Sequence, residues 1–257
     1  MSWAAQRRLV ILLILGSIAL AFFATLLIAT LYKTPSCADT VQNQGEEGVD
    51  CGGSCTYLCQ ASELPPTVLF TKALPNGTGG TDVIAEVENK NATAAAQQVS
   101  YTLTLYGTDQ TLLRKINGTL DLPPATRVPV FVPGITFGKQ HVGSAFLDVD
   151  PASVHWYRVA HDPRVLPHIS SQPIQSGTTA APRIDTVATN ESTTAMTNVR
   201  AIVVVHSDTD EIVAASSTLV PSIPPQGQTT LTFTWNIPFP SIPALIEVIP
   251  MIPLPDR

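Results

Sequence analysis

The feature that most constrains this chain is an uncharged stretch near its N-terminus. Residues 9–32 read LVILLILGSIALAFFATLLIATLY, without a single Asp, Glu, Lys or Arg. About 20 apolar residues suffice to cross a hydrocarbon core of about 30 Å as a helix. The apolar region of a cleaved secretory signal is shorter, about 7 to 15 residues. The length therefore favours an uncleaved transmembrane signal anchor over residues 9–32, with a cleaved signal as the alternative.

Charged residues beside this stretch predict its orientation. Arg7 and Arg8 precede it, and only Lys33 closely follows it. Positively charged flanks tend to stay in the cytoplasm. We therefore expect residues 1–8 to form a cytoplasmic stub and residues 33–257 to lie outside, which describes a single-pass protein of the cell membrane with an extracytoplasmic C-terminal part.

The charge of the exported part narrows the choice of partner. Without Arg7 and Arg8 the chain has 12 Lys and Arg against 20 Asp and Glu, a formal charge of −8. Binding to nucleic acid needs a concentrated basic surface for the phosphates, and the exported sequence contains no Lys/Arg cluster. We therefore expect no nucleic-acid partner, and instead a protein or glycan of the envelope, or a metal ion.

All four cysteines of the chain lie within one short segment, at Cys37, Cys51, Cys55 and Cys59. Disulfides persist in an oxidising compartment, so two bonds are expected, in any of three pairings. Gly52 and Gly53 would permit the tight turn that brings Cys51 and Cys55 together. The alternative is a zinc ion held by four thiolates, although the spacings do not follow the usual pattern of two CxxC pairs.

Oxygen-bearing side chains recur every three or four residues between the first two cysteines. They are Asp39, Asn43, Glu46 or its neighbour Glu47, and Asp50. Hard cations such as Ca²⁺ take six to eight oxygens from carboxylates, Asn side chains, carbonyls and water. The segment is therefore a candidate Ca²⁺ site, although the EF-hand pattern is absent. The alternative is that these carboxylates simply solvate a stalk next to the membrane.

The pattern from Cys37 to Cys55, centred on Asp50-Cys51-Gly52-Gly53, resembles the DCGG cysteine motif of many exported, membrane-anchored bacterial proteins, especially those of candidate-phylum bacteria. In such proteins the motif follows the anchor and precedes Ig-like β-sandwich domains of unknown role. The resemblance covers residues 37–59 and implies a small Cys-rich segment at 33–62 followed by Ig-like domains. Three residues separate Cys55 from Cys59 where the motif usually has two, so the pairing of Cys59 stays open.

The rest of the chain repeats its landmarks in the same order at an offset of about 100 residues. The matched segments are 67–89 with 168–190, 99–106 with 199–206, 123–124 with 224–225, 127–131 with 229–233, and 145–151 with 244–250. Leu105-Tyr106, with the acidic turn and the Pro-Pro turn that follow, also resembles the bacterial Ig-like FxLYD modules, which implies an adhesive or assembly role. The sequence thus predicts two copies of one domain, at 63–163 and 164–257.

Each copy has the pattern of β-strands. Apolar residues alternate with polar ones at Val99, Tyr101, Leu103 and Leu105, as in a half-buried strand. The matching segment 199–205 is more continuously apolar, as in a strand that is covered on both sides. Short strands at this spacing predict two tandem Ig-like β-sandwiches that touch. Prolines in the tail 249–257 argue against strand pairing there, and predict a polyproline-like segment that packs on the second domain or binds a partner.

Catalytic signatures are missing from the sequence, which contains no G-x-S-x-G, phosphate loop or HExxH pattern. We therefore expect no enzyme. His155, Trp156 and Tyr157 form a candidate partner surface, with burial in the core as the alternative. The predicted function is a non-catalytic, membrane-anchored extracytoplasmic protein whose domains bind or space envelope partners. The alternative is a subunit of a membrane-bound secretion or pilus-type assembly.

Overall fold

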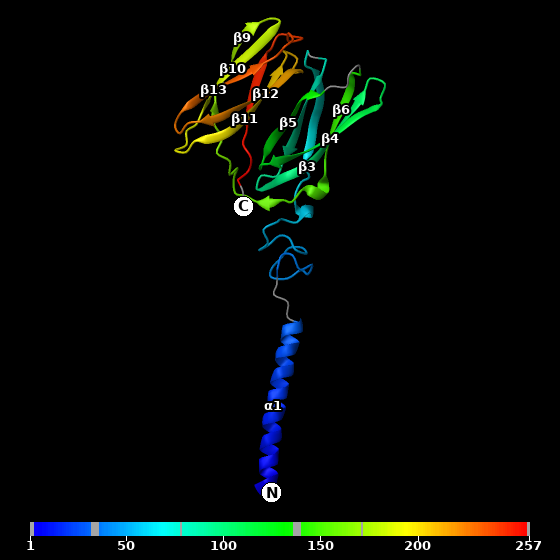
Figure 1. Cartoon of the computed structure of the whole chain (residues 1–257), viewed down its shortest axis with the longest axis vertical. Coiled ribbons are helices and arrows are strands. Elements are labelled where there is room, and N and C mark those ends of the chain that lie inside the picture. Colours follow the sequence, from blue (N-terminus) through cyan, green and yellow to red (C-terminus); the bar gives the residue numbers. More distant parts are fainter. Residues whose placement is uncertain (1–2, 32–35, 78, 136–139, 171, 256–257) are drawn as a thin grey trace. The chain divides into compact units, whose positions relative to one another are not determined.

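A computed structural model describes residues 3–31, 36–77, 79–135, 140–170 and 172–255 (Figure 1). The chain divides into two compact units, residues 1–56 and residues 57–257, and each is described by itself. Helix α1 and most of the cysteine segment belong to the first unit. The second unit contains all the strands. The predicted all-β ectodomain after one apolar helix is confirmed.

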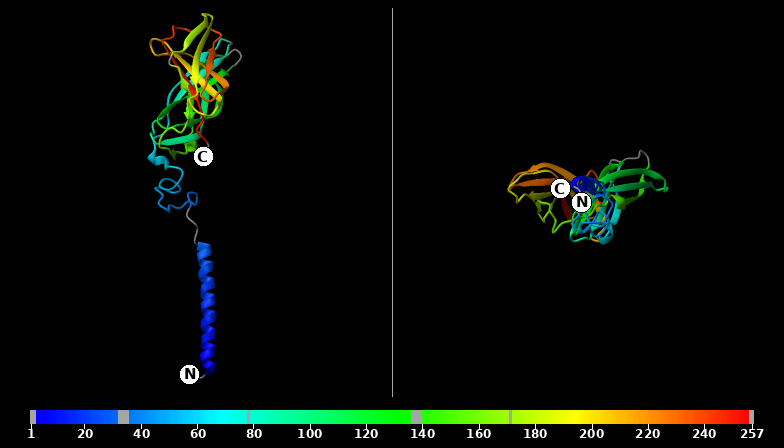
Figure 2. Two further views of the ribbon diagram at one scale, coloured as in Figure 1. Left: turned by 90° about the vertical axis from the view of Figure 1, so that its left-hand side faces the viewer. Right: turned by 90° about the horizontal axis from the view of Figure 1, so that it is seen from below.

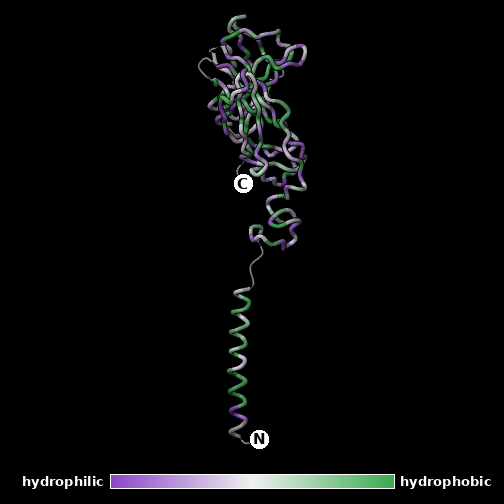
Figure 3. The backbone as a smooth tube through the Cα atoms, turned by 90° about the vertical axis from the view of Figure 1, so that its right-hand side faces the viewer, coloured by the Kyte–Doolittle hydropathy of each residue, from purple (hydrophilic) through white to green (hydrophobic). Residues whose placement is uncertain are grey.

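Helix α1 (Trp3–Leu31) contains nearly all of the uncharged stretch, while Tyr32, the predicted end of the anchor, lies outside the described residues. Its segment Gln6–Thr30 is long and apolar enough to cross a membrane. Apolar residues follow the helix along most of its length (Figure 3), and their spacing in the sequence leaves no polar face. A helix that is apolar all round is typical of a membrane span rather than of a surface helix, and fits a membrane anchor or a signal sequence.

The first sandwich is made of two antiparallel sheets. One sheet has the strand order β1-β2-β5, with β1 (Thr67–Pro75), β2 (Thr81–Asn89) and β5 (Thr126–Ile135). The other has the order β4-β3-β6, with β3 (Ala94–Gly107), β4 (Leu112–Leu122) and β6 (Val142–Val149), and β7 (Tyr157–Arg158) also pairs with β3. Two short 3₁₀ turns, Gln60–Ser62 and Pro151–Ser153, flank this sandwich.

The second sandwich has the same strand order. Its first sheet is β13-β10-β8, with β8 (His168–Ile169), β10 (Ala181–Thr189) and β13 (Gln228–Thr234), and β9 (Ile174–Thr178) also pairs with β10. Its second sheet is β12-β11-β14, with β11 (Met196–His206), β12 (Ile212–Ile223) and β14 (Leu245–Met251). The landmarks that recur in the sequence thus fall on corresponding strands, with β8 and β9 in place of the single long β1.

A buried asparagine occupies the same place in both sandwiches. Asn89 ends β2 and donates its side-chain amide to the carbonyls of Ala94, Leu122 and Pro123, over 2.9, 3.3 and 2.7 Å. Asn190 follows β10 and donates in the same way to the carbonyls of Thr194, Ile223 and Pro224, over 2.8, 3.2 and 3.1 Å. Each side chain therefore joins the end of one sheet to the start of β3 or the residues just before β11 and to the end of β4 or β12, and its own buried amide finds acceptors there.

Strand β11 is covered on both faces, as its continuous apolar sequence predicts. Val203 and Val205 belong to the core between the two sheets of the second sandwich. Ile202 and Val204 point the other way and pack against Ile84 of β2, in a separate cluster shared by both sandwiches. The two sandwiches lie side by side (Figure 2), and this buried apolar cluster joins them.

The C-terminal segment differs from its prediction in two respects. First, strand β14 runs to Met251 and includes Pro250, which pairs in register with Ala201 of β11. This works because β14 lies at the edge of its sheet, where a proline without an N–H is tolerated. Second, the residues after β14 pack on both sandwiches: Ile252 packs on the core of the second, as predicted, while Leu254 is buried against Ala95 and Tyr157 of the first.

Candidate functional site

The cysteine segment is closed by disulfides. Cys37 is bonded to Cys55, and Cys51 and Cys59 are disulfide-bonded as well, so none of the four is a free thiol. A tetrahedral zinc site needs thiolates, and the zinc alternative is therefore wrong.

The turn at the cysteine segment depends on its glycines, as predicted. Gly53 has a φ of +58°, and a Cβ atom added there would lie 1.9 Å from the carbonyl oxygen of Gly45. Gly52, next to it, has a φ of +71°. A left-handed backbone at such close approach is available to glycine at little cost, so the two glycines let the chain fold tightly back on itself.

The four predicted oxygen ligands form a closed ring of hydrogen bonds. The Asn43 amide donates to the Asp39 carboxylate over 2.9 Å, and the Asn43 backbone N–H donates to Glu46 Oε2 over 3.3 Å. Glu46 Oε2 also accepts the backbone N–H of Asp50 at 3.2 Å, and Asp50 Oδ1 accepts that of Asp39 at 2.9 Å. Residues far apart in this coreless loop are thereby held together by carboxylate-to-amide bonds, which are strong because one partner is charged.

This ring fits a hard cation in one respect and not in another. Asn43 Oδ1 is buried and has no hydrogen-bond partner among the described residues. This is the state expected of an oxygen that would coordinate a cation. The carboxylates of Asp39, Glu46 and Asp50 already accept backbone N–H bonds, which stabilise their charge without an ion. The loop is therefore organised by its own amides, and an ion would complete the ring rather than create it.

The predicted partner surface at residues 155–157 is wrong for two of its three members. Trp156 is 2% exposed and belongs to the core of the first sandwich, and Tyr157 is 4% exposed and packs with Ala95 and Leu254. Only His155 is exposed. The alternation of an exposed histidine between buried neighbours is that of a short extended segment, which leads into β7 and its pairing with β3.

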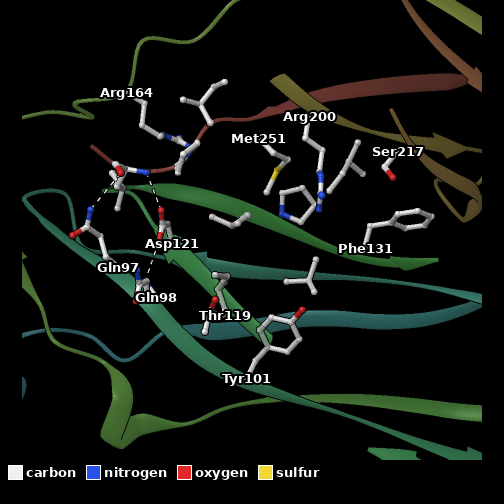
Figure 4. A pocket seen from close by; sticks show the side chains of 18 of the residues that line it. Gln97, Gln98, Tyr101, Thr119, Asp121, Phe131, Arg164, Arg200, Ser217 and Met251 are labelled. Carbon is white, nitrogen blue, oxygen red and sulfur yellow. Dashed lines mark hydrogen bonds between the residues drawn. The ribbon is translucent and has the colours of Figure 1, made fainter. Parts of the chain in front are cut away.

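The structure instead reveals a cleft between the two sandwiches, with a volume of about 1200 Å³ (Figure 4). Strands β3, β4 and β5 form its wall on the first sandwich, and β11, β12 and residues 251–254 form its wall on the second. Phe131, Ile202 and Met251 belong both to this lining and to the shared apolar interface, so the cleft borders that interface. Its shape is therefore fixed by the packing that joins the sandwiches.

The C-terminal segment closes one part of the cleft. The Leu254 backbone N–H donates to Asp121 Oδ2 over 2.8 Å, and Gln97 Nε2 donates to the carbonyls of Leu254 and Pro255 over 3.3 and 2.8 Å. These bonds fasten a segment that follows the second sandwich to strands β3 and β4 of the first (Figure 4). The tail thus links the second sandwich to the first.

Burial and charge set the electrostatics around the cleft and the interface. Burial raises the pKa of the Tyr101 hydroxyl, which lines the cleft, so this side chain stays neutral. On the face of β2 that meets the second sandwich, burial also raises the pKa of Glu86, although nearby Arg127 opposes that shift. An ion pair of 2.6 Å between Lys72 and Glu211 joins the two sandwiches and lowers the pKa of Glu211.

Sequence reasoning missed the residues of this cleft. Its one available signal was Arg200, the single charged residue within the apolar segment 199–205. A charge on a strand that is covered on both faces requires a gap in one of the covering layers, because an unpaired charge is not buried in apolar surroundings. The cleft provides that gap. The other lining residues are apolar and polar side chains whose sequence gives no comparable signal.

Comparisons with known proteins place no function on this chain. No protein-family model and no curated protein matches it. Two solved structures that show a likeness are the transglutaminase of red sea bream, 14% identical with a TM-score of 0.23, and the exo-chitosanase of Amycolatopsis orientalis, 15% identical with a TM-score of 0.24. The likeness covers 68% and 72% of this chain but only 27% and 25% of those proteins, and it is too weak to support a functional conclusion.

Proposed function

We propose that this chain is a single-pass, membrane-anchored extracytoplasmic protein whose two sandwiches bind or space partners in the cell envelope without catalysis. Its N-terminal apolar helix and β-sandwich sheets fit a membrane-anchored surface protein. The disulfide-bonded loop lies between them in the sequence. In this proposal the loop is the connection between the anchor and the sandwiches.

The observation that carries the binding role is the preformed cleft. Its two walls come from different sandwiches, and a shared apolar cluster holds those walls in one body. Binding to a rigid site avoids the entropy cost of ordering the site, which would otherwise reduce affinity. A flexible pair of domains used only as a spacer has no need for such a cleft.

A retention experiment tests this function. Purified full-length chain in detergent is mixed with envelope fragments from its source cells, sedimented, and compared with a chain in which Ser217→Trp fills the cleft. We expect the wild-type chain to be retained and the filled variant to be released. Equal retention of both, or retention of neither, contradicts a binding role for the cleft.

Topology is tested separately. Protease added to intact source cells should digest the sandwiches and spare the helix, because we place residues 33–257 outside. Protection of the sandwiches would overturn this orientation. Co-purification of a stoichiometric integral-membrane protein would instead favour the assembly-subunit alternative.

A further inference from the structure

The cleft between the sandwiches carries one unpaired positive charge. Arg200 on β11 lines it, is exposed, and makes no hydrogen bond or ion pair with any described residue. Figure 4 shows its side chain pointing from β11 into the cleft. The second arginine of the lining, Arg164, is neutralised by Asp162 through a contact of 2.7 Å. Arg200 is therefore the cation in this wall that remains available to a ligand.

The one carboxylate in the lining does not balance this charge. Asp121 Oδ1 accepts the backbone N–H of Gln98 over 2.9 Å, and Oδ2 accepts that of Leu254 over 2.8 Å. Both of its oxygens are thereby engaged in fixing the tail and β3. A cleft with an available guanidinium and an occupied carboxylate favours a ligand that carries negative charge, even though the exported chain as a whole is acidic.

Six further polar residues of the lining have side chains that are available to a ligand. Their side chains make no hydrogen bond with any described residue, and they come from both sandwiches: Gln98, Tyr101, Thr119, Asn198, Ser217 and Thr218. Hydroxyl and amide groups can both donate and accept. Such a set is suited to a ligand with many hydroxyl groups along its length, because each ligand hydroxyl also needs a donor and an acceptor.

Tyr101, which is half-buried and also packs against the core of the first sandwich, adds an aromatic ring to this set. It pairs in register with Gly118 on β4, and a Cβ atom at Gly118 would lie 2.3 Å from the Tyr101 hydroxyl oxygen. The absence of a side chain at Gly118 thus lets the tyrosine ring lie across the neighbouring strand. Aromatic rings combine a large apolar face with a polar edge, which suits a sugar ring and its hydroxyls.

We propose that the cleft binds an acidic oligosaccharide, with Arg200 on a carboxylate of the sugar and the amide and hydroxyl side chains on its hydroxyls. This inference rests on the proposed binding function and names its ligand class. An acidic peptide is the competing ligand, and strand addition by such a peptide is disfavoured at β5, one of the edge strands in the lining, because β5 has Pro129 and Pro133 there. A proline offers no N–H for strand pairing at that edge.

Calorimetric titration of the full-length chain in detergent tests the ligand class. The probes are short oligogalacturonate and oligoglucuronate, with methyl-esterified oligogalacturonate as the neutral match and oligoglutamate of equal charge as the peptide match. We expect at least one uronate oligomer to bind, and the esterified and peptide matches to bind about tenfold more weakly or not at all. Binding of neither uronate, or tighter binding of oligoglutamate, overturns the inference.

Variants test the site. Arg200→Gln should weaken uronate binding about tenfold, and Thr119→Val should weaken it severalfold because it removes one hydroxyl and keeps the branched shape. Arg158→Gln removes an exposed arginine outside the cleft and should leave binding unchanged. Equal loss in the Arg158 and Arg200 variants, or no loss in either, contradicts the site.

The failure of this inference is distinguishable from failure of the proposed function. If the wild-type chain is retained by envelope fragments and released by Ser217→Trp, but binds no uronate, the cleft has a different ligand and the binding function stands. If the envelope fragments do not retain the chain either, both fail.

Discussion

The two sandwiches share their strand order and their buried asparagine, but they differ in how their edges are covered. The first is extended by the segments before β1 and after β6, which add Leu58, Val154 and Trp156 to its core. It also receives Leu254 from the tail. In the second, the opening strand is divided into the two-residue β8 and the wholly exposed β9. The first sandwich thus packs with the segments that flank its strands and with the tail, and the second sandwich is joined to it.

The largest expected effect concerns the extended core of the first sandwich. Trp156→Ala should lower the free energy of unfolding by about 3–5 kcal/mol, because it removes a fully buried aromatic side chain and leaves a cavity. Urea unfolding of the full-length chain in detergent measures this, with the adjacent exposed His155→Ala as control. An effect below about 1 kcal/mol would show that these segments do not belong to the cooperative core.

The asparagines offer a matched comparison between the sandwiches. Asn89→Ala and Asn190→Ala should each cost about 3 kcal/mol, because each leaves several buried carbonyls without their donor. The same unfolding experiment measures both. A large cost for Asn89 and a negligible one for Asn190 would mean that the likeness in hydrogen bonding is not a likeness in stability.

Much of the fold could be predicted from the sequence, because the spacing of apolar residues along a strand indicates which of its faces are buried. The alternation at Val99, Leu103 and Leu105 and the continuous apolar run of β11 indicated one-sided and two-sided burial, and the structure confirms both. The asparagines could have been found as well, since Asn89 and Asn190 stand at the repeat offset. Their role was hidden because an Asn-rich turn looks the same whether its side chains are solvated or buried.

The candidate site was predictable only in part, and for a physical reason. The loop residues Asp39, Asn43, Glu46 and Asp50 are close in sequence, so their spacing indicated that they could converge. The cleft is assembled from strands about 100 residues apart, and its members have no local pattern. The prediction that Pro250 prevents strand pairing was wrong because the effect of a proline depends on whether its strand lies at a sheet edge. The local sequence does not show where in the sheet a strand lies.

A smaller change in stability is expected in the cysteine loop, which has no apolar core. Ca²⁺ binding there stays a prediction, with a Kd of about 10⁻⁴–10⁻³ M as in extracellular modules. An excess of about tenfold over Kd would stabilise the loop by about 1.4 kcal/mol. Calorimetric titration should show saturable heat that Asn43→Ala and Asp39→Asn abolish and that Glu191→Gln, a change outside the loop, keeps. Without such heat in the wild-type chain, the ring is a hydrogen-bonded structure with no ion.

The smallest expected effect concerns Glu86, which lies at the interface between the sandwiches. Because burial raises the pKa of Glu86 above its ordinary 4.5 in the folded chain, its stabilising contribution is complete below that value and is lost as pH rises through the raised pKa. Glu86→Gln should therefore flatten this part of the profile and stabilise the chain at neutral pH. Unfolding measured from pH 4 to 8 for both chains checks the sign. A steeper loss in the variant would contradict burial as the cause.

We infer that the shared cluster around Ile84, Ile202 and Val204 makes the two sandwiches one body and holds the cleft open between them. Native-state hydrogen exchange of the full-length chain tests this through the amides of β2 and β11. We expect the same opening free energy for both strands, and an equal fall in both with Ile202→Ala. Exchange of β11 through a lower-energy opening, with β2 still protected, would show that the second sandwich opens alone and contradict the claim.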